Sequence, residues 1–212
     1  NAIPLSGFET VRPTYQFIKG LLRTVPDLII DSDHMMAISP DEGGTSRAVY
    51  LANVLGLDMG MFYKRRDYTQ IVDGRNPIVA HEFLGSSVEG KDVIIIDDMI
   101  SSGDSIIDVA TELKRRKAKR IFAAATFGLF TNGLDKFDKA YEEGIIHGIL
   151  TTNLIYQTPE LLSRPYYINC DLSKYIALLI DTLNHDGSIS SILSPNERIQ
   201  HVVQKYKNGE PI

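Results

Sequence analysis

The hydrophobic positions of the chain fall into two patterns that alternate along the sequence. Short continuous apolar runs are typical of buried strands, whereas apolar residues at helical intervals are typical of amphipathic helices. The apolar runs predict strands at residues 35–39, 57–63, 81–84, 93–96, 121–126, 149–151 and 166–170. The helical intervals predict helices over residues 11–25, 48–55, 106–113, 134–141 and 175–183.

This alternation predicts an α/β fold, a mainly parallel β-sheet flanked by helices on both faces. In such sheets, ligands bind beyond the carboxyl ends of the strands. Three polar segments leave predicted strands at that end, namely residues 40–44, 64–80 and 97–104. The second has no clear period and contains Gly74 and Pro77, so we expect a long loop there. A ligand site is therefore expected where the three segments meet.

Length, charge and cysteine content narrow the class of protein. The 212 residues suit one domain, and a net charge of -5 does not favour a general nucleic-acid or membrane surface. No apolar run approaches the roughly 20 residues of a membrane-spanning helix. The single cysteine, Cys170, excludes an internal disulfide and fits a reducing compartment such as the cytoplasm. We therefore expect a cytoplasmic protein that binds neither nucleic acid nor membrane.

The segment after the strand at 93–96 combines two carboxylates with the start of a helix. Small residues at 101–105 place unpaired backbone N–H groups where the helix dipole favours an anion. Asp97 and Asp98 supply acceptors for sugar hydroxyls or for Mg²⁺. A sugar phosphate would satisfy both halves, yet an ordinary helix cap with Asp98 in water explains the residues equally well. The residues alone leave both alternatives open.

Two other segments carry charges that would suit phosphate chemistry. Residues 39–47 read SPDEGGTSR, in which Asp41 or Glu42 would be a metal ligand beside a glycine turn. Taken alone, a cap and a tight turn explain that segment better. The cationic cluster at 64–66, KRR, is usually solvated surface, but beside phosphates it would neutralise charge in a transition state.

Together these motifs resemble a known family. Residues 97–105, DDMISSGDS, resemble the phosphoribosyl-pyrophosphate loop of type I phosphoribosyltransferases. Residues 39–48, SPDEGGTSRA, are similar to the SPDxGGxxRA motif of ribose-phosphate pyrophosphokinases, and the cluster at 64–66 lies where that family carries its catalytic flexible loop. The resemblance covers residues 35–113 and becomes looser toward the C-terminus.

The resemblance implies a type I phosphoribosyltransferase-like fold and the transfer of diphosphate from ATP to O1 of ribose 5-phosphate with Mg²⁺. By position, Asp41 would be a metal ligand. Lys64 would be the catalytic lysine, and Arg66 would help to clamp the transferring phosphates. The residues implied for ribose 5-phosphate binding are Asp97, Asp98, Ser101, Ser102, Gly103, Asp104 and Ser105.

Two features depart from the family pattern. The family loop usually reads D-T-x-G-T, whereas Ser101 here replaces Asp, Ser102 and Ser105 replace Thr, and Asp104 replaces Gly. Asp104 adds a negative charge beside the implied phosphate, so we expect its side chain to point away from the ligand. The family also has two similar domains. We therefore expect residues 1–212 to be a single phosphoribosyltransferase-like domain, the C-terminal domain of a longer homo-oligomeric enzyme, and to be inactive alone.

Two other functions remain open. The first is a phosphoribosyltransferase, which would use as its substrate the phosphoribosyl pyrophosphate that the implied reaction makes. The motif at 39–48 and the cluster at 64–66 argue against it. A catalytically silent homologue that binds phosphates and regulates an active partner is favoured by the altered loop. The retention of Asp41, Lys64 and Asp97 disfavours that interpretation.

Overall fold

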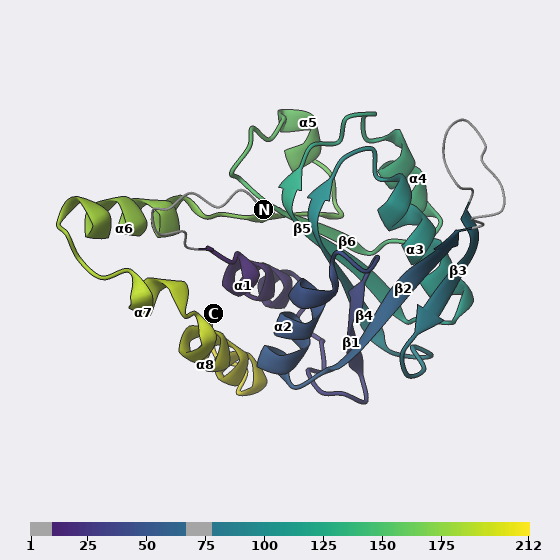
Figure 1. Ribbon diagram of the computed structural model, residues 1–212, viewed down its shortest axis with the longest axis horizontal. Coiled ribbons are helices and arrows are strands. Elements are labelled where there is room, and N and C mark those ends of the chain that lie inside the picture. Colours follow the sequence, from purple (N-terminus) through teal and green to yellow (C-terminus); the bar gives the residue numbers. More distant parts are fainter. Residues whose placement is uncertain (1–9, 67–77) are drawn as a thin grey trace.

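The computed structural model describes residues 10–66 and 78–212, with the backbone alone described at residues 64–66 and 78–81. Within these residues, seven strands form one sheet in the order β3-β2-β1-β4-β5-β6-β7 (Figure 1). The strands are β1 (Met35–Ser39), β2 (Asp58–Arg66), β3 (Ile78–Leu84), β4 (Asp92–Ile100), β5 (Arg120–Gly128), β6 (Gly148–Thr152) and β7 (Tyr167–Cys170). Every neighbouring pair is parallel except β2 with β3. The predicted α/β fold with a mainly parallel sheet is confirmed.

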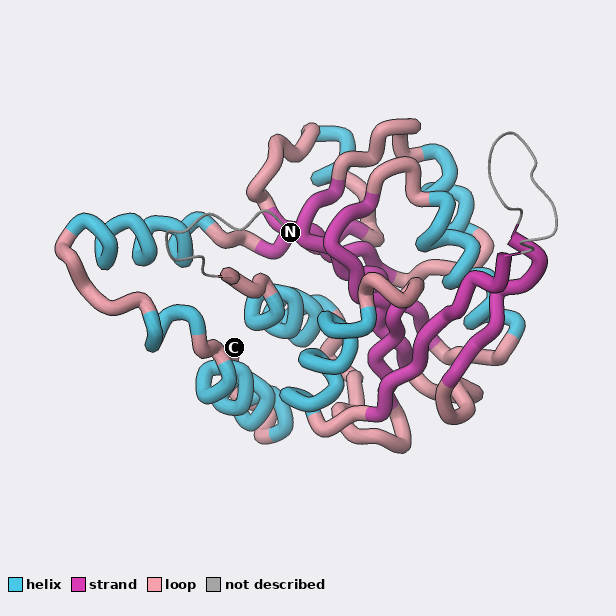
Figure 2. Tube along the Cα trace, in the orientation of Figure 1, coloured by secondary structure: helices cyan, strands magenta, loops and turns pink. Residues whose placement is uncertain are grey.

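Helices cover both faces of this sheet (Figure 2). They are α1 (Thr14–Thr24), α2 (Thr45–Leu55), α3 (Asp104–Arg115), α4 (Asp135–Glu142), α5 (Pro159–Leu162), α6 (Ser173–Asn184), α7 (Ser190–Leu193) and α8 (Asn196–Lys207). Helices α1, α2 and α8 pack on one face, and α3 and α4 pack on the other. The central strands are therefore buried on both sides, which explains why they read as continuous apolar runs. In β4, for example, Ile94 and Ile96 face one core while Val93 and Ile95 face the other.

The outer strand pair differs from the sequence prediction. Residues 64–66 belong to β2 and residues 78–80 belong to β3, where Lys64 is paired with His81 in antiparallel register. The prediction of one loop over residues 64–80 is therefore wrong at both of its ends. Backbone hydrogen bonds, rather than apolar side chains, hold such a pair together, so polar residues can extend it beyond the apolar run.

Helix α6 extends away from the rest of the molecule (Figure 1). Tyr175 is its buried residue, whereas Leu178, Ile180 and Leu183 are exposed. Short helix α7 and then α8 follow it and bring the chain back against α1 and α2. In the part of the chain that the structure describes, no helix combines the length and apolar character that crossing a membrane requires.

Candidate functional site

The candidate site lies where the order of the strands reverses. From β1 the chain crosses to β2 on one side, and from β4 it crosses to β5 on the other, while β1 and β4 themselves are neighbours. At such a switch point the two following loops diverge and leave a crevice at the carboxyl end of the sheet. Residues 40–44 follow β1 and residues 101–103 follow β4, so both loops leave the sheet at this switch point. Two of the three segments expected to meet are thus adjacent.

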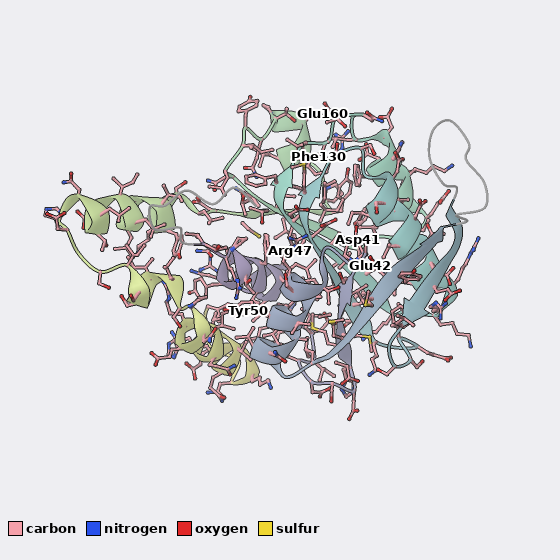
Figure 3. The ribbon with its side chains drawn as sticks, viewed as in Figure 1. Asp41, Glu42, Arg47, Tyr50, Phe130 and Glu160 are labelled. Atoms are coloured by element: carbon pink, nitrogen blue, oxygen red, sulfur yellow. The ribbon has the colours of Figure 1, made fainter. Side chains whose placement is uncertain are left out.

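The loop after β1 is a tight turn built around Asp41. The Ser39 hydroxyl donates to the Asp41 carbonyl oxygen at 2.6 Å, and the Gly44 N–H donates to Asp41 Oδ1 at 3.0 Å. A Cβ at Gly44 would lie 2.7 Å from Ser39 Oγ and 3.5 Å from the Ile96 carbonyl oxygen. Glycine at position 44 therefore avoids a close contact with the Ser39 hydroxyl, while the distance to β4 is an ordinary van der Waals contact. Asp41 and Glu42 follow the end of β1, and Arg47 lies in the first turn of α2 (Figure 3).

The two neighbouring aspartates do not follow β4 but lie within it. Asp97 is in register with Ala125, and the strand continues to Ile100. The predicted loop at 97–104 is therefore wrong for its first half, because the long strand β5 offers backbone partners beyond the end of the apolar run. Since successive side chains alternate, Asp97 turns inward and is 16% exposed, whereas Asp98 is 64% exposed.

An arginine from α2 connects both aspartates to the first loop. Arg47 Nη2 lies 3.2 Å from Asp97 Oδ1 and 3.5 Å from Asp98 Oδ1. Burial, together with the side-chain hydrogen bond and charge of Asp98, raises the pKa of Asp97 to about 6 against the opposing effect of Arg47. The Asp98 N–H also donates to Asp97 Oδ1 at 2.8 Å and favours the ionised form. The pair therefore holds a carboxylate that titrates close to neutral pH.

The loop after β4 depends on a glycine at its centre. Gly103 has φ +85°, and a Cβ there would lie 2.1 Å from Cζ of Phe137, a fully buried residue of α4. Only glycine fits this position, which turns the chain into the first turn of α3. The neighbouring loop after β5 supports it, since the Leu129 N–H donates to the Ile100 carbonyl at 2.8 Å and the Thr131 N–H to the Ser101 carbonyl at 3.1 Å. The loop is thus held from both sides.

Asp104 has a cationic partner that the sequence did not indicate. Lys136 from α4 donates to Asp104 Oδ1, and the Ser102 hydroxyl donates to Asp104 Oδ2 at 2.7 Å. The hydrogen bond from Lys136, with that from Ser102, lowers the pKa of Asp104. The side chain is directed toward α4 and its charge is paired. That it points away from a bound ligand remains a prediction, as does the part of Ser105 in the first turn of α3.

A cavity of about 440 Å³ opens beside the aspartate pair. Arg47, Asp97 and Asp98 line it together with Ile96 and Phe127. Its size suits a small ligand, and its lining comes mainly from α1, α2 and the strands β4 and β5 but includes neither residues 40–44 nor residues 101–105. Oxygen donors for a divalent cation are present at the crevice, although the described residues contain no group of three or more His, Cys, Asp or Glu side chains that could hold a metal.

The two residues predicted to be catalytic lie on the neighbouring strand. Lys64 and Arg66 are in the last residues of β2, which pairs with β1 on the side away from β4. Their backbone is described, but their side chains and residues 67–77 lie outside the described part of the structure. The predicted roles of Lys64 and Arg66 therefore stay predictions.

The chain is similar to known proteins over most of its length. The model of the phosphoribosyl transferase domain family matches residues 17–147. The ribose-phosphate pyrophosphokinase of Vibrio parahaemolyticus is 31% identical over 164 residues, which cover 76% of this chain and 49% of the relative. That of Mycoplasma pneumoniae is 30% identical over 185 residues, covering 87% and 52% respectively. The chain thus spans about half the length of these curated relatives.

One solved structure supports the fold assignment. The phosphoribosylpyrophosphate synthetase from Mycobacterium smegmatis superposes with a TM-score of 0.66 at 22% sequence identity. The match covers 83% of this chain and 52% of that chain. The type I phosphoribosyltransferase-like fold expected from the motifs is therefore confirmed.

Proposed function

Because the chain belongs to the phosphoribosyl transferase domain family, we propose that it is the ribose 5-phosphate-binding domain of a ribose-phosphate pyrophosphokinase. The main observation in support of this proposal is that Arg47 forms ion pairs with Asp97 and Asp98 on the strand that leads into the Gly103 loop. The hydroxyls of a sugar phosphate would bind to the aspartate pair, and its phosphate would bind to the Gly103 loop. We further propose that residues 1–212 form the C-terminal domain of a longer cytoplasmic, homo-oligomeric enzyme and are inactive alone.

In the binding step, two separate parts of the site contact the sugar phosphate. The 5-phosphate lies against the backbone N–H groups at residues 101–105, where α3 begins, and accepts from them. The ribose hydroxyls donate to Asp97 and Asp98. Arg47 keeps Asp97 in place and favours its ionised state, so that it accepts rather than donates. Pairing with Lys136 keeps the Asp104 charge from opposing the phosphate.

The transfer half joins O1 of ribose 5-phosphate to the β-phosphorus of ATP. The bond between that phosphorus and the oxygen bridging to the α-phosphate breaks, and AMP leaves with the electron pair. The O1 proton is lost to solvent. Lys64 and Arg66, at the end of β2, would neutralise charge on the transferring phosphates. Such a reaction needs positioning and charge neutralisation rather than a covalent nucleophile.

The residues present fit Mg²⁺ as the cofactor. Mg²⁺ prefers oxygen ligands and is commonly held by one or two carboxylates together with substrate phosphates. Asp41, whose backbone and Oδ1 are fixed by the turn, would supply such a carboxylate at the crevice. When bound, the ion supplies positive charge to the phosphates.

Calorimetric titration of the chain with ribose 5-phosphate tests the proposal. Saturable binding is expected, and Asp97→Asn should weaken it by about tenfold or more, because a hydrogen bond to a charged group is lost. Asp108→Asn, an isosteric change of the same charge at an exposed position of α3, is the control and should bind as the unmodified chain does. An absence of saturable binding, or equal losses in both variants, would contradict the proposal.

A second experiment separates an active enzyme from a silent homologue. In the full-length enzyme, Lys64→Ala should remove most of the turnover while ribose 5-phosphate still binds with unchanged affinity. A silent homologue would show no turnover to lose.

A further inference from the structure

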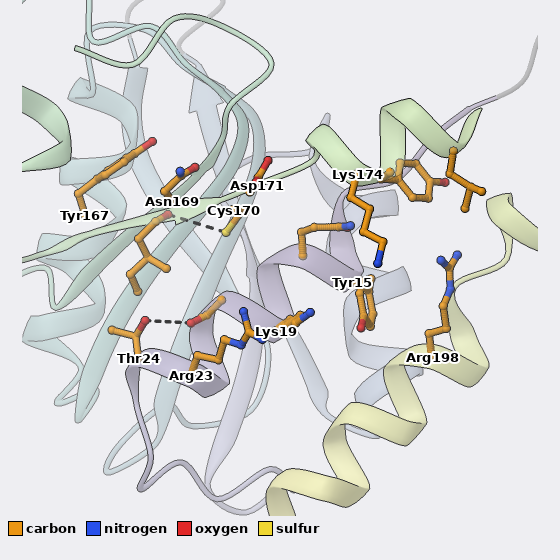
Figure 4. Close-up of a pocket in the computed structure, with 15 residues that line it drawn as sticks. Tyr15, Lys19, Arg23, Thr24, Tyr167, Asn169, Cys170, Asp171, Lys174 and Arg198 are labelled. Atoms are coloured by element: carbon orange, nitrogen blue, oxygen red, sulfur yellow. Dashed lines mark hydrogen bonds between the residues drawn. The ribbon is translucent and has the colours of Figure 1, made fainter. Parts of the chain in front are cut away.

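A second cavity, of about 600 Å³, lies on the far edge of the sheet from β3. It is bordered by α1, strand β7, the start of α6 and the start of α8 (Figure 4). None of the residues that line it belongs to the candidate site described above. We define the basic pocket by five of its side chains, Tyr15, Lys19, Lys174, Tyr175 and Arg198.

Positive charge is concentrated in the basic pocket although the chain as a whole is acidic. Lys19, Arg23, Lys174 and Arg198 all line it, in a chain with a net charge of -5. Asp171 contributes a carboxylate to the lining, and this carboxylate already accepts two hydrogen bonds. It accepts from the Ser173 N–H at 2.8 Å and from Asn153 Nδ2 at 2.7 Å, and so caps the start of α6. The pocket therefore has an excess of positive charge.

Lys19, Lys174 and Arg198 lie close to one another, whereas the fourth cation, Arg23, donates from its Nε to the Ile212 carbonyl oxygen at 2.7 Å. Among residues 10–66 and 78–212, no ion pair is formed by Lys19, Lys174 or Arg198. Burial lowers the pKa of Lys19, and the neighbouring charges of Arg23 and Lys174 lower it further. Repulsion among these positive charges destabilises the folded state, and a bound anion would offset that repulsion.

The cations are also arranged around aromatic rings. Lys19 Nζ lies 5.8 Å and the Arg198 guanidinium 5.7 Å from the centre of the Tyr15 ring, and the same guanidinium lies 5.9 Å from that of Tyr175. Arg198 is held there because its Nη2 donates to the Ile192 carbonyl at 2.8 Å. As Figure 4 shows, Lys174 and Arg198 approach the Tyr15 ring from different helices. Cationic hydrogen-bond donors for an anion thus lie next to the rings of Tyr15 and Tyr175, against which an aromatic ring of a ligand can pack.

We propose that the basic pocket binds a ligand that carries a phosphate or diphosphate group, which Lys19, Lys174 and Arg198 contact. The cavity is within the size range of small-molecule sites and exceeds what a single phosphate fills. The ligand is either a free di- or polyphosphate or the phosphorylated end of a nucleotide whose base packs against Tyr15. This proposal does not depend on the proposed function, because no residue is shared between the two sites.

Calorimetric titration with pyrophosphate and with adenosine diphosphate tests this proposal. At least one probe is expected to bind saturably. The double variant Lys19→Gln and Lys174→Gln should weaken that binding by about tenfold or more, since two charge-assisted hydrogen bonds are lost. The double variant Lys119→Gln and Lys207→Gln removes the same charge at exposed positions outside the pocket lining and should change the affinity by less than about twofold.

The two probes also distinguish the sources of the phosphate. Equal affinities would assign the pocket to free phosphates, whereas tighter binding of the nucleotide that is lost in Tyr15→Leu would assign it to nucleotides. If neither probe binds saturably, or if the pocket variant binds as the unmodified chain does, the proposal is wrong. Circular dichroism of each variant establishes that it is folded. Ribose 5-phosphate affinity, measured separately, should be unaffected by the pocket variants, so failure at one site is distinct from failure at the other.

Discussion

Replacing Gly103 by alanine introduces one methyl group at the centre of the proposed phosphate loop. The new Cβ would lie 2.1 Å from Cζ of Phe137 and within 2.9 Å of both Cε atoms of that ring. Contacts this short do not persist, so either the loop or the ring must move. Phe137 is fully buried in the core between the sheet, α3 and α4, and it has little freedom to do so.

Two costs contribute to the expected loss of stability. A residue with a side chain at φ +85° costs about 1–2 kcal/mol. Overpacking a well-filled core adds about 1–3 kcal/mol. The free energy of unfolding should therefore fall by about 2–5 kcal/mol, which is a large share of the roughly 5–15 kcal/mol typical of a domain. The backbone N–H groups of the loop would also be displaced, so ribose 5-phosphate binding should weaken in parallel.

Gly133 offers a matched control for the conformational part of this loss. It also has a positive φ, +76°, but a Cβ at this position would meet no atom within 4 Å. Gly133→Ala should therefore lose only about 1–2 kcal/mol. Urea unfolding followed by far-ultraviolet circular dichroism measures both variants, since the chain has no tryptophan. If Gly103→Ala loses no more stability than Gly133→Ala, Phe137 does not support the loop as described and the reasoning fails.

Four further predictions concern the charged residues of the structure. Arg47→Met should raise the pKa of Asp97 above its value of about 6, as measured by carbon NMR titration, because the guanidinium that opposes the effect of burial is lost. The pKa of Asp97 is raised, so the folded chain holds a proton that the unfolded chain has lost between about pH 4 and pH 6. This contribution to stability is lost as the pH rises through 6, and Asp97→Asn should flatten that part of the pH profile of urea unfolding. Lys136→Met should weaken ribose 5-phosphate binding by leaving the Asp104 charge unpaired, and adding Asp104→Asn should restore it in calorimetric titration; no recovery would mean that the charge does not act on the ligand. Asp92→Ala should lower the free energy of unfolding by about 2–3 kcal/mol, because the largely buried Arg120 guanidinium loses its bonds to the buried carboxylate and is left with the exposed Asp27 as a partner, and a loss below about 1 kcal/mol would contradict this.

The sequence predicted the central strands well because they are buried on both faces and read as apolar runs. Their ends were predicted less well, since Asp97 and Asp98 on β4, and residues 64–66 on β2, are polar yet continue the backbone ladder. Helix α8 was not predicted, although Ile199, Val202 and Val203 have helical spacing and are buried. That spacing was the available signal.

The sequence predicted individual residues of the candidate site but not the ion pairs that join them. The motifs contained the aspartates and the Gly103 loop, but the ion pairs between Arg47 and the aspartates require β1 and β4 to be neighbours. The partner of Asp104 comes from α4, 32 residues along the chain. Because such pairs join separate elements, they depend on the tertiary fold, which local patterns do not specify.

The most direct test of the account is a crystal structure of the chain soaked with ribose 5-phosphate. The account predicts the phosphate against the backbone N–H groups at residues 101–105, the ring hydroxyls on Asp97 and Asp98, and Asp104 still paired with Lys136. A crevice that stays empty at saturating ligand, or a phosphate bound elsewhere with Asp104 turned into the loop, would contradict it.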